Sequence, residues 1–246
     1  MKIDSKLPEV GTTIFTVMSR LAADCDAINL SQGFPDFDCD PALVEAVAHH
    51  MREGRNQYAP MQGVPSLRRA IAAKFHYFYG AHYDPETEIT ITSGGTEALF
   101  DAIAAVVRPG DEVVVIEPCY DSYVPAIRLN GGIPVVARMT LDDFRVDWND
   151  VRRAISVRTR LIIINSPHNP SGSVLREEDI AELRSTLQQT DALVLSDEVY
   201  EHIIFDGCPH LGMARYPDLA ARSFIVGSFG KTFHTTGWKV GYCVAP

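Results

Sequence analysis

The chain has 246 residues, of which 46% are hydrophobic, so it can bury one large core or two small ones. It carries 22 basic and 32 acidic residues, which gives a formal net charge of −10. This acidity argues against a nucleic-acid partner and against an anionic membrane surface, because both require a basic face on the protein.

The five cysteines are scattered, and no two of them form a CxxC pair. A disulfide framework is therefore not expected, and a reducing compartment fits better. The N-terminus lacks the apolar run of a signal peptide, and no apolar stretch approaches the roughly 18 residues of a membrane span. We expect a cytoplasmic protein without a membrane segment.

Residues 1–40 show no regular pattern, and we expect them to form an N-terminal arm or part of a small domain. Residues 41–246 are expected to form one large domain. Its first regular segment is a helix with Pro65 near its start. The apolar face expected for this helix contains Leu67, Ala70, Ile71, Lys74, Phe75 and Phe78.

Strand-like and helical segments alternate from residue 88 onward. Strands are expected at 88–92, 112–116, 133–137, 161–165, 192–195 and 223–226, and helices near 96–108, 120–130, 147–156 and 176–189. Several of these strands are continuous apolar runs, which is typical of strands buried on both faces. The pattern predicts an α/β fold with a mostly parallel sheet between two layers of helices. In such folds, ligands bind beyond the carboxyl ends of the strands.

Residues 239–246 read as one more strand, with no closing helix or polar tail after it. We therefore expect the large domain to be C-terminally incomplete.

Two polar motifs follow the first and fourth of these strands. Residues 93–98, SGGTEA, open a helix, and the glycines and the helix N-terminus suit a phosphate group. The alternative is a tight turn followed by a helix capped by Thr96. Residues 166–172, SPHNPSG, form a rigid loop in which Asn169 stands between two prolines; the alternative is an ordinary turn.

Two further motifs bring charge to the end of a strand. Asp197 lies at the end of the apolar strand 192–195, where burial of a carboxylate is unfavourable unless a cation lies beside it. Lys231 follows strand 223–226 among small and apolar residues and can serve as an amine nucleophile. The alternatives are an acidic first turn of a helix and a surface lysine.

Two other kinds of site are excluded. Gly230-Lys231-Thr232 resembles the end of a nucleotide-binding P-loop, but the required glycine five residues earlier is Ile225, so the phosphate cradle is absent. A zinc site is not expected either, because Cys208-Pro209-His210 has no second pair at ligand spacing. We expect no metal.

Taken together, the motifs resemble those of the class I and II aminotransferases, which are fold-type I pyridoxal-phosphate enzymes. The similarity covers essentially the whole chain and is greatest to the methionine aminotransferases, relatives of the kynurenine and glutamine transaminases. The stretches that carry it are 29–37, 56–63, 93–99, 168–172, 196–202, 228–231 and 237–241. One departure is that the usual Asn-Pro-Thr-Gly is Asn169-Pro170-Ser171-Gly172 here, which keeps the hydroxyl group.

The resemblance implies a role for each matching residue. It implies that Lys231 carries pyridoxal 5'-phosphate and moves the substrate proton, and that Asp197 pairs with the pyridinium nitrogen, so that the ring accepts electrons. The remaining implied cofactor contacts are Asn169 and Tyr200 at the ring hydroxyl, Tyr120 on the ring face, and Gly95, Thr96, Ser228 and Lys239 at the phosphate. Tyr58 is implied to reach the phosphate of the other subunit of a homodimer, and Gly33 and Asn169 to lie near the substrate.

The implied fold is the large domain of the aspartate-aminotransferase type, without the C-terminal small domain that supplies the arginine for the substrate carboxylate. The implied reaction moves an amino group from an amino acid, methionine or an aromatic one, to a 2-oxo acid. Two alternatives stay open. One is a pyridoxal-phosphate-dependent β-lyase acting on sulfur amino acids. The other is a truncated, non-catalytic module that binds the cofactor.

Overall fold

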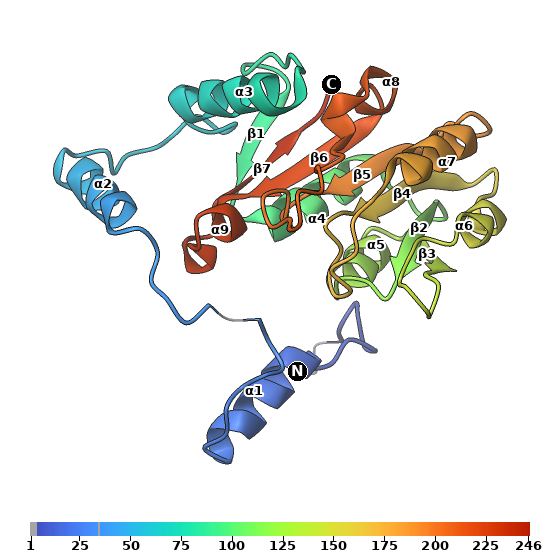
Figure 1. Ribbon diagram of the computed structural model, residues 1–246, viewed down its shortest axis with the longest axis horizontal. Coiled ribbons are helices and arrows are strands. Elements are labelled where there is room, and N and C mark those ends of the chain that lie inside the picture. Colours follow the sequence, from blue (N-terminus) through green and yellow to red (C-terminus); the bar gives the residue numbers. More distant parts are fainter. Residues whose placement is uncertain (1–3, 34) are drawn as a thin grey trace.

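The computed structural model describes residues 4–33 and 35–246. Its core is a seven-stranded sheet with the order β1-β7-β6-β5-β4-β2-β3 (Figure 1). The strands are β1 (Ile89–Thr92), β2 (Glu112–Glu117), β3 (Ile133–Arg138), β4 (Thr159–Asn165), β5 (Leu193–Asp197), β6 (Ser223–Ser228) and β7 (Gly241–Val244). Every strand expected from the sequence is present, with its ends shifted by at most two residues within residues 88–228.

Strands β3, β2, β4, β5 and β6 run parallel to one another, whereas β7 runs antiparallel to both β6 and β1. This confirms the mostly parallel sheet. Because only β7 is reversed, its N-terminal end lies at the edge where the other strands have their carboxyl ends. The register places Gly241 opposite Thr92 on one side and opposite Ser228 on the other.

Helices cover both faces of the sheet, as the apolar strands predicted (Figure 1). Helices α3 (Pro65–Tyr79), α6 (Trp148–Ala154) and α7 (Glu177–Leu187) contribute to the core on one face, and α4 (Gly95–Val106) and α5 (Tyr123–Leu129) to the core on the other. Strand β4 shows the alternation, since Ile162 and Ile164 belong to the first core and Leu161 and Ile163 to the second. The sheet is therefore buried on both sides.

The face expected for α3 is wrong at two positions, because Ala70 and Phe78 are exposed. Ile71 is buried as expected, but so is Arg68, at 3% exposure. The Arg68 guanidinium donates hydrogen bonds to two backbone carbonyls and pairs with Glu86. An arginine whose donors are satisfied in this way can be buried, and apolar periodicity does not reveal it.

The first two helices stand apart from the sheet (Figure 1). Neither α1 (Ile14–Asp24) nor α2 (Pro41–Arg52) contains a buried residue. Helix α3 is the first element that packs on the sheet. The division of the chain at residue 40 stays a prediction.

Three observations bear on the kind of site to look for. Over the described residues, no helix is long and apolar enough to cross a membrane. In the same part of the chain, no three His, Cys, Asp or Glu side chains are grouped as a metal site. The five cysteines are free thiols.

Candidate active site

Most of the predicted site residues meet at one edge of the sheet. Asp197 ends β5, Lys231 lies in the short helix α9 (Phe229–Thr232) after β6, and Asn169 lies in the loop after β4. Tyr120 follows β2, and the glycine-rich turn follows β1. Lys239 also reaches this edge, because it precedes the reversed strand β7. The sheet topology thus gathers residues that are far apart in the sequence.

Asp197 is the buried charge at the centre of this edge, with 3% exposure. Its Oδ2 accepts a hydrogen bond of 2.5 Å from the hydroxyl of Tyr123, and its Oδ1 accepts one of 3.3 Å from the backbone N–H of Val199. Burial raises the pKa of Asp197 to about 6, although both hydrogen bonds oppose the rise. Among the described residues, no basic side chain forms an ion pair with Asp197, so its carboxylate suits a cation from outside the chain.

Lys231 and Tyr200 face the same space as Asp197. The Nζ atom of Lys231 lies 5.2 Å from the centre of the Tyr200 ring. The positive charge of Lys231 lowers the pKa of Asp197, while burial and then Asp197 raise the pKa of the Tyr200 phenol. An amine, a carboxylate and a phenol therefore line one site.

The loop that carries Asn169 is held by two side chains. The Asn165 amide donates to the backbone carbonyl of Asp197 at 2.9 Å and accepts from the backbone N–H of Asn169 at 2.7 Å. The His168 Nδ1 lies 2.8 Å from the Ser171 hydroxyl. Burial lowers the pKa of His168, although its hydrogen bond to the carbonyl of Pro118 opposes this. These contacts tie the loop both to β5 and to the segment that leads to Tyr120.

The glycine-rich turn and the segment before β7 approach each other closely. A β-carbon on Gly241 would lie 2.4 Å from the carbonyl carbon of Gly94 and 2.5 Å from the nitrogen of Gly95, so only glycine fits at position 241. A β-carbon on Gly94 would lie 3.4 Å from the Nζ atom of Lys239, and one on Gly95 would lie 3.7 Å from Ser228 Cβ. The N-terminus of α4, a 12-residue helix, therefore has a lysine and a serine beside it, a combination that suits a phosphate group.

Thr96 and Tyr120 complete this side of the site. The Thr96 hydroxyl lies 3.2 Å from the Tyr120 hydroxyl, and the Tyr120 ring contacts the ring of Tyr123 edge to face, with centroids 5.7 Å apart. Tyr120 thus stands between the phosphate side and the carboxylate side. It precedes α5, which begins at Tyr123 and not near residue 120 as expected.

Two predicted residues lie apart from this edge. Tyr58 is fully exposed, and a β-carbon on Gly33 would have no neighbour within 4 Å in the part of the chain that the structure describes. Both precede α3 in the chain, in the part that contains α1 and α2, neither of which has a buried residue. Their roles at the other subunit and at the substrate stay predictions.

Sequence reasoning missed Tyr123 and Asn165, although both contact Asp197. Tyr123 stands at the start of a helix and Asn165 at the end of a strand, where neither forms a recognisable motif. Their contacts to Asp197 span 74 and 32 residues of sequence. Only the pairing of β4 with β5 could have indicated Asn165, which lies opposite Asp197 in the register.

The fold and this edge of the sheet define a class of site. A buried carboxylate, an amine and a helix N-terminus lie at this edge, an arrangement that suits a ligand with one cationic and one anionic group.

Comparison with known sequences gives the family. Residues 26–246 match Aminotransferase class I and II, and the chain belongs to this pyridoxal-phosphate-dependent family. Methionine aminotransferase of Escherichia coli is 55% identical over 98% of this chain, and human kynurenine–oxoglutarate transaminase 1 is 36% identical over 92%. The chain spans 63% of the length of the first relative and 57% of the second.

Solved structures agree. The crystal structure of the Escherichia coli methionine aminotransferase YbdL superposes with a TM-score of 0.95 at 52% identity. The superposition covers 100% of this chain and 64% of the YbdL chain. N-succinyldiaminopimelate aminotransferase from Mycobacterium tuberculosis also reaches 0.95, at 42% identity and with the same coverage. The large-domain fold implied by the resemblance is therefore confirmed.

Proposed function

We propose that the protein is a pyridoxal-phosphate-dependent transaminase that moves an amino group from an amino acid to a 2-oxo acid. The observation that carries the proposal is the buried carboxylate of Asp197, which has no basic partner among the described residues and faces the same space as Lys231. A carboxylate in such a place requires a cation, and the protonated ring nitrogen of the cofactor supplies one.

The residues at the sheet edge fit the other groups of the cofactor. The N-terminus of α4 at Gly95 and Thr96, with Ser228 and Lys239 beside it, would hold the phosphate. Asn169 and Tyr200 would hold the ring hydroxyl, and Tyr120 would cover the ring face. The bound cofactor acts as an electron sink for the carbanion that forms when a substrate loses its α-proton.

The chain's own residues then have distinct tasks. Lys231 would hold the cofactor through its Nζ atom, and the same amine would take the α-proton from the substrate and return it. Asp197 stays ionised and thereby keeps the ring nitrogen protonated. Tyr200, beside Lys231, keeps its proton, because burial raises its pKa.

The relatives support a choice of substrate. The Escherichia coli relative is a methionine aminotransferase, and the human one is a kynurenine–oxoglutarate transaminase. We infer methionine or an aromatic amino acid as the amino donor and a 2-oxo acid as the acceptor, in a cytoplasmic enzyme. The protein is proposed to work as a homodimer in which the exposed Tyr58 reaches the phosphate of the other subunit and Gly33 lies near the substrate carboxylate.

The chain has only five lysines, which makes a direct test possible. The purified protein loaded with cofactor is reduced with borohydride and digested, and the labelled peptide is identified by mass spectrometry. Label is expected on Lys231 and not on Lys74, which pairs with Glu201, and Lys231→Ala should lose it. Amino transfer from methionine and from an aromatic amino acid to a 2-oxo acid is then measured.

Two outcomes would contradict the proposal. Labelling that persists in the Lys231→Ala variant would place the cofactor elsewhere. Breakdown of a sulfur amino acid without any amino transfer would identify a β-lyase in place of a transaminase.

A further inference from the structure

We propose that Tyr123 is a positioning residue of this site, which fixes the Asp197 side chain and keeps it ionised through a hydrogen bond. The proposal rests on the proposed function only for its catalytic consequence. Its structural part concerns two residues of the chain and can be tested without the cofactor.

The hydrogen bond has one possible direction. Tyr123 is buried, with 2% exposure, and burial followed by the charge of Asp197 raises its phenol pKa well above 10. The phenol therefore keeps its proton and donates it to Asp197 Oδ2 at 2.5 Å. A hydrogen bond donated to a carboxylate favours the charged form of the acid.

The same bond holds the orientation of the carboxylate. Asp197 Oδ2 is bonded to Tyr123, which comes from α5 on one face of the sheet, and Oδ1 is bonded to the backbone N–H of Val199. Rotation of the side chain would break both hydrogen bonds. The site thus presents the carboxylate in one orientation ahead of ligand binding, and the protein bears the ordering cost during folding.

The groups around Asp197 explain why this donor matters. Burial raises the Asp197 pKa, and the negative charge of Glu198 raises it further, whereas Tyr123, the backbone N–H of Val199 and the charge of Lys231 lower it. Tyr200 faces the same carboxylate as a neutral phenol. Of the groups that oppose burial, the Tyr123 hydrogen bond is the strongest. Without it, Asp197 should take up a proton nearer to neutral pH.

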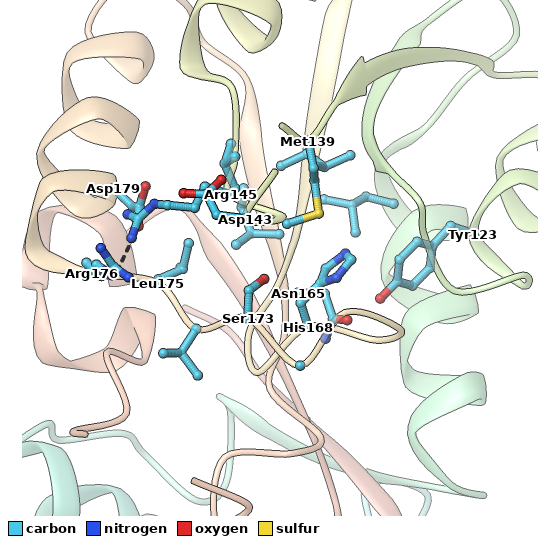
Figure 2. A pocket seen from close by; sticks show the side chains of 16 residues that line it. Tyr123, Met139, Asp143, Arg145, Asn165, His168, Ser173, Leu175, Arg176 and Asp179 are labelled. Carbon is cyan, nitrogen blue, oxygen red and sulfur yellow. Dashed lines mark hydrogen bonds and ion pairs between the residues drawn. The ribbon is translucent and has the colours of Figure 1, made fainter. Parts of the chain in front are cut away.

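The surroundings of Tyr123 make a clean substitution possible. Its ring forms one end of a cavity of about 250 Å³. Figure 2 shows Asn165 and His168 near this end, and Arg145 and Asp179 at the other. The ring also packs in the core under α4 and α5. Phenylalanine would keep these ring contacts and remove only the hydroxyl group.

The test compares Tyr123→Phe with Tyr83→Phe. Tyr83 is the matched control, because its buried hydroxyl has no hydrogen-bond partner among residues 4–33 and 35–246. In the cofactor-free protein, the buried carboxyl group of Asp197 is titrated by infrared difference spectroscopy against Asp197→Asn. Tyr123→Phe is expected to raise its titration midpoint by about one pH unit or more, and Tyr83→Phe to leave it unchanged.

The loaded enzyme gives a second readout. In Tyr123→Phe, the acid limb of the pH profile of kcat and the midpoint of the cofactor absorbance titration should both shift to higher pH, while KM changes little. Replacement of Tyr123 by 3-fluorotyrosine, a stronger donor with the same shape, should move the acid limb and the cofactor titration to lower pH. This variant keeps the test valid if the phenylalanine variant folds poorly.

The possible outcomes separate the two proposals. Titration midpoints of Asp197 that are the same in the wild type and in both Tyr123 variants would overturn the role of Tyr123. A shifted midpoint in a protein that does not transaminate would refute the proposed function and leave the role of Tyr123 standing.

Discussion

Replacement of Lys74 by methionine should destabilise the fold by about 3 kcal/mol, because among the described residues Lys74 is the only lysine or arginine that pairs with the buried carboxylate of Glu201. The Glu201 side chain is 3% exposed, while that of Lys74 is 17% exposed. Two phenols complete the cluster. Tyr79 donates to Glu201 at 2.5 Å, and the Tyr242 hydroxyl lies 2.6 Å from Lys74 Nζ and 3.0 Å from Glu201.

The magnitude follows from what remains after the substitution. Breaking a buried ion pair by removing one partner costs about 3–5 kcal/mol, because a buried charge is left without a counter-charge. The lower end applies here, since Tyr79 and Tyr242 still donate hydrogen bonds to Glu201. Burial raises the pKa of Glu201, but Lys74 and Tyr79 together lower it by more, so Glu201 is ionised at neutral pH in the native protein.

The assay is urea unfolding of the purified protein at neutral pH, followed by circular dichroism. The double variant Lys74→Met/Glu201→Gln should recover much of the loss, because it leaves no unpaired charge. Arg184→Met is the control. This substitution breaks the ion pair between Arg184 and Asp218, whose side chains are 39% and 55% exposed, respectively. It should lower the free energy of unfolding by less than about 1 kcal/mol. A loss below about 1 kcal/mol for Lys74→Met would refute the reasoning.

Three further predictions concern the site and its pH dependence. Asp197→Asn should still bind the cofactor but lose more than about tenfold in turnover, about 1.4 kcal/mol in the barrier; a smaller loss would leave Asp197 only the role of accepting the backbone N–H of Val199 in the turn after β5. Gly241→Ala should weaken cofactor binding at least about tenfold in a fluorescence titration, because its β-carbon would lie 2.4 Å from Gly94. Gly237→Ala should not weaken binding, because no described residue lies within 4 Å of the β-carbon it adds; equal affinities of the two variants would contradict the crowding argument. Finally, the pKa of Glu201 is lowered on folding, so its contribution to stability is complete above its unfolded pKa of about 4.3 and is lost as the pH falls through its folded value. Glu201→Gln should therefore make the urea midpoint less dependent on pH between about 5 and 3, and an unchanged slope would show that other carboxylates dominate this range.

The sequence predicted the edge of the sheet better than it predicted the contacts behind that edge. Apolar runs placed the strands, and the carboxyl ends of parallel strands lie together, so Asn169, Asp197 and Lys231 could be grouped from their positions in the sequence alone. The reversal of β7, which brings Lys239 to the same edge, follows from strand pairing and not from composition. The contact of Tyr123 with Asp197 depends on how a helix packs across the sheet, 74 residues away in sequence, and no local pattern encodes it.

The position of β7 between β1 and β6 has a consequence for the protein as it is made on the ribosome. Among the described residues, β7 is the one strand that pairs with β1, so residues 89–92 have no strand to pair with until residues 241–244 have been synthesised. At about 5–20 residues per second, the roughly 150 residues between them take on the order of 10–30 s to translate. During that time β1 lacks its strand partner, and the unpaired backbone groups of such a strand can recruit other chains. We therefore expect nascent chains that stop short of β7 to bind chaperones through this segment, and to release them when β7 is inserted.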